Sequence, residues 1–204
     1  MKDLFQLARH SVAGLLTLLL FTAVLGLGYP LAVTGIAAVS MPWRANGSLV
    51  TAEGDHTTNP SDAVGSQIIG QAADGTLFLP RPSAAGEGWD PLSSYGSNLG
   101  PDNEDLVATI KQRKAEIAQR EGVDPADVPA DAVTASASGL DPDISPAYAA
   151  LQVPRVARAN GLSEKRVRGL VADHIDGRTL GVLGEPRVNV LMLNVAVRDA
   201  ARLG

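Results

Sequence analysis

The hydrophobic pattern divides this chain into two unequal parts. Residues 11–43 contain no Asp, Glu, Lys or Arg, and most of them are apolar. A bilayer core of about 30 Å needs about 20 such residues as a helix, which satisfies its own backbone hydrogen bonds in lipid. The pattern therefore predicts an N-terminal segment at 1–10, a single transmembrane helix at 11–39 with its core at about 12–34, and a linker at 40–64.

A cleaved signal peptide is the alternative interpretation of this start. Lys2 and Arg9 resemble a basic leader, and Ala38-Val39-Ser40 resembles a cleavage site. The apolar part of a signal peptide, however, is only about 7–15 residues long, which is much shorter than the stretch found here. The length favours a retained anchor. Pro30 is expected to bend the helix or end its straight part, because proline lacks an N–H and clashes with the preceding turn.

The rest of the chain mixes strand and helix patterns. Short apolar runs predict strands at 64–71, 77–79 and 187–193, and a turn into an extended piece at 128–133. Good N-cap residues predict helices that begin after Asn103, Ser145, Ser163 and Asn194. Gly122 should end the first of these helices, and Pro154 should bend the second. We expect one mixed α/β (α+β) domain at 65–204, and the distribution of basic residues predicts that it lies outside the cytoplasm.

A long segment in this domain, residues 81–101, is dense in Gly, Pro and Ser. Long loops inside compact domains are usually either functional or disordered. Trp89, Tyr95 and Leu99 supply apolar anchors, so we expect an ordered loop.

The charges are distributed unevenly along the chain. There are 17 basic and 22 acidic residues, for a net charge of −5. Lys2, Arg9 and Arg44 against Asp3 give residues 1–44 a charge of +2, which leaves −7 for the remainder. Basic flanks stay in the cytoplasm, so the N-terminus is predicted inside and the domain outside. An acidic domain argues against nucleic-acid binding and against adhesion to anionic lipid headgroups, leaving membrane lipid as a partner of the span only.

Motifs for catalysis and metal binding are weak. The chain has no cysteine, which excludes disulfides and thiolate metal sites. It contains neither a P-loop nor a His-Glu-x-x-His pattern, and its histidines are scattered at His10, His56 and His174. Ser136 and Ser138 lie near Asp141, but their surroundings do not match a nucleophile elbow. A membrane-anchored serine hydrolase is therefore a weak hypothesis, and no catalytic activity of the chain itself is expected.

The segment 134–146 is the most unusual one, because it places two serines, a glycine and two carboxylates before a helix start. One interpretation is a docking loop in which acidic side chains hold a cation or a partner's arginine. The other is turn and capping chemistry. Arg81 has the same two interpretations, pairing with a partner or bracing the loop. The candidate docking residues are Arg81, Ser83, Asn98, Ser136, Ser138, Gly139, Asp141 and Asp143.

Small residues in the predicted span offer a second candidate surface. Small side chains let membrane helices approach closely, although glycine is also common in such helices generally. The candidate packing positions are Gly14, Thr17, Gly26 and Gly28.

Several motifs resemble the C chain (KdpC) of the Kdp potassium-transporting ATPase. They follow the family's order over nearly the whole chain, at residues 65–71, 78–84, 97–103, 133–146, 152–157 and 186–194. Two positions depart from the family pattern. Ala137 stands where the family usually has Gly, which reduces backbone freedom, and Asp143 stands where it usually has His.

The resemblance implies a non-catalytic accessory subunit of an ATP-driven, high-affinity potassium uptake pump in the bacterial plasma membrane. Such a subunit supports assembly and acts like a chaperone that raises the ATP affinity of the ATPase chain. The implied partners are a P-type ATPase subunit and a channel-like potassium-translocating subunit, and a small single-span peptide is a further candidate. ATP and potassium are then handled by the complex, and no cofactor is expected on this chain. The alternative is a membrane-anchored, outer-face protein that binds a cation or ligand independently of an ATPase.

Overall fold

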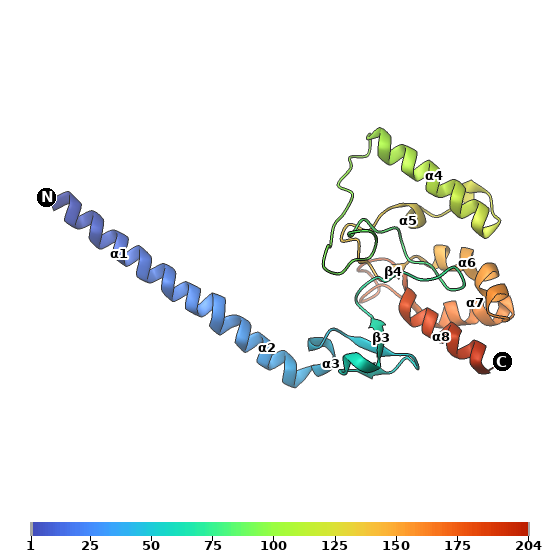
Figure 1. Ribbon diagram of the computed structural model, residues 1–204, viewed down its shortest axis with the longest axis horizontal. Coiled ribbons are helices and arrows are strands. Elements are labelled where there is room, and N and C mark those ends of the chain that lie inside the picture. The colour runs from blue at the N-terminus through green and yellow to red at the C-terminus, as the bar shows by residue number, and fades with distance from the viewer. Residues whose placement is uncertain (1, 204) are drawn as a thin grey trace. The chain divides into compact units, whose positions relative to one another are not determined.

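The computed structural model describes residues 2–203, which form two compact units that divide between Gly47 and Ser48. The first unit is helical (Figure 1). It consists of α1 (Lys2–Ala23), the π-helical turn η1 (Val24–Gly28), α2 (Tyr29–Ser40) and the short α3 (Pro42–Ala45). From Asp3 to Ser40 the helix is long and apolar enough to cross a membrane. This finding agrees with the predicted single span.

The helix does not end at Pro30, and its irregularity lies just before that residue. The Tyr29 amide donates to the Val24 carbonyl, five residues back, which closes the π-helical turn. Helical structure then continues to Ser40. Because proline supplies no amide to the preceding turn, one wider turn accommodates it without breaking the helix.

The four candidate packing positions of the span are all exposed within this unit. Gly26 and Gly28 lie inside the π-helical turn, whereas Gly14 and Thr17 belong to α1. The Thr17 hydroxyl donates to the Ala13 carbonyl at 2.9 Å, so its polar atom is satisfied within the helix. Any use of this surface by a partner helix stays a prediction.

The second unit contains two three-stranded antiparallel sheets. The first has the order β2-β1-β3, from β1 (Leu49–Thr51), β2 (His56–Thr57) and β3 (Ala63–Ser66), with the 3-10 turn η2 (Pro60–Asp62) before β3. The second has the order β4-β6-β5, from β4 (Asp143–Ile144), β5 (Ile175–Asp176) and β6 (Arg187–Asn189). The fold is thus of the α+β kind within the predicted mixed class. Residues 40–64, predicted as a linker, include β1 and β2.

Three predicted helix starts are confirmed. The N-cap side chain accepts a hydrogen bond from the amide three residues on in α4 (Glu104–Glu121), α6 (Pro146–Ala159) and α7 (Glu164–Asp173). Gly122 ends α4 in the left-handed conformation that favours glycine. Pro154 lies within α6, which runs through it without interruption. These signals act over three or four residues, which is why the sequence alone locates them.

The predicted extended piece at 128–133 is wrong. It contains the helical turn α5 (Ala130–Val133), which follows the 3-10 turn η3 (Pro125–Asp127). The Thr134 amide donates to the Ala130 carbonyl at 3.0 Å, and the turn buries Ala132 and Val133. Burial of these two side chains against the core decides the local conformation.

The predicted strand at 187–193 is correct only as far as Asn189. The Asn189 side chain accepts from the Met192 amide at 3.2 Å and begins α8 (Val190–Leu203). Val190, Leu193 and Val197 are buried at helical spacing, so the apolar run belongs mainly to a helix. Asn194 is therefore not a cap. Its side chain is buried in the middle of α8.

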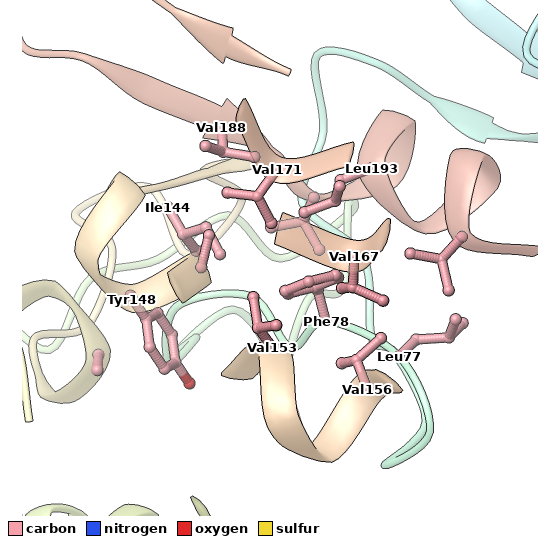
Figure 2. Close-up of a cluster of buried hydrophobic side chains, with 14 of the residues drawn as sticks. Leu77, Phe78, Ile144, Tyr148, Val153, Val156, Val167, Val171, Val188 and Leu193 are labelled. Atoms are coloured by element: carbon pink, nitrogen blue, oxygen red, sulfur yellow. The ribbon is translucent and has the colours of Figure 1, made fainter. Parts of the chain in front are cut away.

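The predicted strands at 64–71 and 77–79 also need correction. The first ends at Ser66, and the second is absent from the described residues. Phe78 is nevertheless fully buried among the side chains of the main core cluster (Figure 2). The Asn194 side chain accepts from the Phe78 amide and donates to its carbonyl, both at 2.9 Å. The side-chain amide of Asn194 therefore makes the two backbone hydrogen bonds that a neighbouring strand would make in a sheet.

Leu79 is held in the same way by Gln152. The Gln152 carboxamide accepts from the Leu79 amide at 2.8 Å and donates to its carbonyl at 3.1 Å. Gln152 itself is fully buried in α6. Because these amide contacts satisfy the backbone of residues 78–79, the segment enters the core without a sheet partner.

Candidate functional site

All the candidate docking residues except Asn98 gather where two segments meet, 81–96 and 134–145, which we call the paired loops. The Ser136 amide donates to the Pro82 carbonyl and the Tyr95 amide to the Ser138 carbonyl, each at 3.0 Å. The Ser94 hydroxyl also donates to the Ser138 carbonyl, at 2.9 Å. Segments about 40 to 60 residues apart in the chain are therefore joined through their backbones, and the long 81–101 loop is ordered over this stretch.

Arg81 braces the paired loops from within the chain. Its Nη1 atom lies 2.8 Å from Asp141 Oδ2, with the two side chains 24% and 31% exposed. The Arg81 Nε atom is buried and has no hydrogen-bond partner among the described residues. The structure thus favours the bracing interpretation over a pair with a partner's carboxylate.

Ser83 and Gly139 form the tightest contact between the two loops. The Ser83 hydroxyl donates to the Gly139 carbonyl at 2.7 Å and accepts from the Trp89 amide at 2.8 Å. Gly139 has a φ of +72°, and a Cβ atom there would lie 2.6 Å from the Ala85 Cβ and 2.7 Å from the Tyr95 carbonyl oxygen. Only glycine fits this position without moving backbone.

Ser136 and Ser138 act in turn formation. Their hydroxyl oxygens are 3.2 Å apart. Ser136 Oγ accepts from the Asp141 amide at 3.3 Å, and Ser138 Oγ accepts from the Leu140 amide at 3.1 Å. None of these hydrogen-bond partners is a general base, so the arrangement lacks what an activated serine nucleophile needs.

Asp143 is paired on both of its carboxylate oxygens. Oδ2 lies 3.0 Å from Arg187 Nε, and Oδ1 accepts from the Asn189 side chain at 3.2 Å. Burial raises the pKa of Asp143 above its ordinary value, and the negative charge of the neighbouring Asp141 raises it further. The hydrogen bond from Asn189 and the positive charge of Arg187 both lower this pKa, but they do not cancel the effect of burial. In the part of the chain that the structure describes, no group of three or more His, Cys, Asp or Glu side chains could hold a metal ion.

This raised pKa predicts a pH-dependent stability. Between the ordinary value of 3.8 and the raised one, the folded state binds more protons than the unfolded state. The contribution of Asp143 is therefore fully present below about pH 3.8 and is lost as the pH rises through the folded-state pKa. We expect the free energy of unfolding of the parent chain, relative to Asp143→Asn, to fall as the pH rises from the ordinary value of 3.8 through the raised folded-state pKa.

Urea unfolding of the two proteins in the same detergent at each pH measures this difference. Asp199→Asn, on the exposed face of α8, serves as a control for the loss of any carboxylate. A difference that stays constant or grows with pH would mean that the ion pair with Arg187 outweighs the cost of burial.

Asn98 and the two departures from the family pattern, Ala137 and Asp143, have different local environments. Asn98 is exposed and lies outside the hydrogen bonds of the paired loops, with a φ of +51° that asparagine tolerates. Ala137 is not among the described residues with positive φ, so its position does not require the glycine usual in the family. Asp143, the other departure from the family pattern, supplies a carboxylate for the ion pair with Arg187.

Sequence reasoning missed three side chains that hold residues 77–79, the segment that leads into the paired loops. Gln152 and Asn194 hold residues 78–79, and Arg155 donates to the Leu77 carbonyl at 2.9 Å and to the Gln152 side chain at 2.7 Å. Their signal is a polar residue at a core-facing position of an amphipathic helix. Such a residue must find partners on burial, although its sequence neighbours do not reveal which ones.

Two cavities adjoin this region of the second unit. One, of about 190 Å³, is lined by side chains that include Trp89, Arg113, Arg120 and Tyr148. Burial raises the pKa of Tyr148, and Arg120 beside it opposes the rise. The other, of about 290 Å³, is lined by residues that include Gln71, Asp74, Asn194 and Arg198. Both cavities contain mixed polar and apolar groups, which do not specify one ligand.

Comparison with known proteins identifies relatives along the whole chain. The family model described as "K+-transporting ATPase, c chain" matches residues 11–199. The chain is 52% identical over 199 residues to the potassium-transporting ATPase KdpC subunit of Kineococcus radiotolerans, covering 97% of each protein. The corresponding subunit of Beijerinckia indica is 48% identical over 190 residues, 93% of each protein. That of Mycobacterium bovis is 46% identical over 192 residues, 93% of this chain and 97% of the relative.

Proposed function

Because the chain belongs to the family of the KdpC subunit, the c chain of K+-transporting ATPases, we propose that it is a non-catalytic accessory subunit that supports assembly of a potassium uptake pump. The observation that carries the proposal is the match over residues 11–199, which includes the apolar helix, the paired loops and the core. The sequence similarity to the relatives therefore extends over nearly the whole chain, beyond any single motif.

The proposed partners are a P-type ATPase subunit and a channel-like potassium-translocating subunit, and a small single-span peptide is a further candidate. Charge supports an orientation with the N-terminus in the cytoplasm and the second unit outside. The apolar helix anchors the chain in the bacterial plasma membrane as a single-pass protein. The acidic second unit then lies on the side from which potassium enters.

The same proposal includes a chaperone-like effect that raises the ATP affinity of the ATPase chain. With the second unit outside, this effect reaches the ATP site through the span or through the assembled complex. The chain contains no P-loop, so the proposal assigns ATP and potassium to the complex. The alternative of an independent outer-face cation receptor lacks comparable support, because Asp141 and Asp143 are already paired with arginines of the same chain.

The proposal predicts the behaviour of cells that lack this chain. At limiting external potassium, high-affinity uptake should be lost on deletion of the gene and restored by the full chain. ATP hydrolysis by pump purified without the chain should need a higher ATP concentration for half-maximal rate. Uptake of labelled potassium and an ATP titration of the purified pump measure the two effects.

Two truncated chains serve as controls for this experiment. Residues 1–47 supply the apolar helix alone, and residues 48–204 behind a cleavable signal peptide supply the second unit alone. Neither should restore uptake by itself, since the proposed role needs the second unit attached to the span. Normal uptake in the deletion strain would refute the accessory role.

A further inference from the structure

A hairpin between β5 and β6 carries an exposed apolar tip. The backbones of Thr179 and Leu183 exchange two hydrogen bonds of 2.9 Å, and the chain reverses between them. Leu180, Val182 and Leu183 are 87%, 72% and 58% exposed. We call residues 179–184 the hairpin tip. Its three large apolar side chains fall within four consecutive residues, 180–183, and face solvent in the second unit.

The turn of this hairpin contains a residue that its backbone disfavours. Leu180 and Gly181 have φ values of +54° and +77°, and the Val182 amide donates to the Thr179 carbonyl at 3.3 Å. Two positive φ values in succession are those of a type I′ turn, which favours Asn, Asp or Gly at the position of Leu180. A leucine costs stability there and gains no burial in this chain. Residues that break a local rule without a local gain are expected at functional surfaces.

The charges around the hairpin tip cancel one another. The tip itself carries none. At its base Arg178 is paired with Glu185 at 2.6 Å, and Arg187 with Asp143 at 3.0 Å. The tip has no basic residue to attract anionic headgroups and no aromatic ring to anchor it at the interface, so charge and interfacial anchoring give lipid no advantage as its partner. Its chemistry fits an apolar pocket on a protein.

The proposed function indicates which protein could carry such a pocket, namely a subunit of the same potassium pump. Residues 41–47 connect the end of α2 to the second unit and span about 25 Å at full extension, so a subunit that binds the predicted span lies within reach of the second unit. We propose that the hairpin tip docks into an apolar pocket of a membrane-embedded subunit of the same potassium pump. This inference rests on the proposed function and names the contact through which the accessory subunit binds.

The test compares variants of the full chain, tagged at its C-terminus, in mildly solubilised native membranes. Leu180→Asn places the residue that the turn favours, so the variant should be at least as stable as the parent chain while its recovery of the pump subunits falls about tenfold, as loss of a buried anchor predicts. Ile68→Ser is the matched control, because Ile68 is 59% exposed and lies outside both the hairpin tip and the paired loops. It should recover the pump subunits as the parent does.

A photo-crosslinking residue at Val182 identifies the occupant directly. A crosslink to a membrane-embedded pump subunit supports the proposal. A crosslink to a second copy of the chain, or to lipid alone, overturns it. Equal recovery by Leu180→Asn and the parent also overturns it, while the proposed function stands. If the parent chain itself recovers no pump subunit, the proposed function fails instead.

Discussion

Gly139→Ala is expected to destabilise the second unit by about 3 kcal/mol, and Gly122→Ala by only about 1 kcal/mol. The two glycines have nearly the same φ, +72° and +71°. Alanine therefore pays the same cost of left-handed backbone at both positions. At Gly122 the new Cβ would meet no atom within 4 Å, whereas at Gly139 it would meet Ala85 and the Tyr95 carbonyl at less than 3 Å.

Urea unfolding in detergent, followed by the fluorescence of Trp89 in a Trp43→Phe background, measures both variants. Trp89 lies in the paired loops, and the chain has two tryptophans, so this background isolates the signal of the site. Equal destabilisation by the two substitutions would mean that the paired loops can separate at little cost. The tight Ser83–Gly139 contact would then not hold the site together.

Arg155→Met is expected to destabilise the second unit by about 3 kcal/mol or more. Arg155 Nε donates to both oxygens of Glu121 at 3.0 Å. The Glu121 side chain is 0% exposed and that of Arg155 is 14% exposed. Its guanidinium also donates to the carbonyls of Gly75 and Leu77. Methionine keeps most of the apolar stem, so the substitution removes mainly the charge and the donors.

The cost follows from what remains after the arginine is removed. Glu121 keeps Arg120 as an ion-pair partner at 2.8 Å, but the Arg120 side chain is 33% exposed. In addition, the backbone carbonyls of Gly75 and Leu77 lose the hydrogen-bond donor that Arg155 supplied. Removing one member of a buried ion pair strands the other charge, which is more costly than removing both. Glu121→Gln added to Arg155→Met should therefore recover part of the lost stability.

Arg158→Met provides the matched control for Arg155→Met. Arg158 lies three residues further along α6 and is exposed, so its loss should change the free energy of unfolding by no more than about 0.5 kcal/mol. Urea unfolding of five proteins completes the comparison: the parent, the single variants Arg155→Met, Glu121→Gln and Arg158→Met, and the double variant. An additive double variant would show that the charges of Glu121 and Arg155 act independently of each other.

Features that depend on short-range chemistry were predictable from the sequence. The caps at Asn103, Ser145 and Ser163 each need one side chain and an amide three residues away. The apolar helix needs only length and the absence of charge. The resemblance to the potassium-pump subunit also came from local motifs, and the family match over residues 11–199 confirms it.

Features that depend on distant partners were not predictable. The 77–79 run has the composition of a strand, but its hydrogen bonds go to Asn194 and Gln152, which lie 116 and 73 residues away. The 187–193 run is apolar enough for a strand, and the cap at Asn189 together with burial at helical spacing turns most of it into α8. In both cases tertiary contacts override local propensity.

The candidate site shows the same division between local and distant contacts. Sequence composition drew attention to Arg81, Ser136 and Asp141, and the structure brings these residues together. In the structure, the polar atoms of these residues bind mostly to one another. This arrangement favours a role in holding the two loops together and in forming their turns. The sequence could not distinguish bracing from docking, because the contacts run between segments about 50 residues apart.

The most direct test of the accessory-subunit account is recovery of this chain, tagged at its C-terminus, from mildly solubilised native membranes, with mass spectrometry of the proteins that accompany it. We predict that a P-type ATPase and a large polytopic protein are recovered with it in a fixed ratio. Recovery of the chain alone, under detergent conditions that keep other membrane complexes intact, would contradict the account.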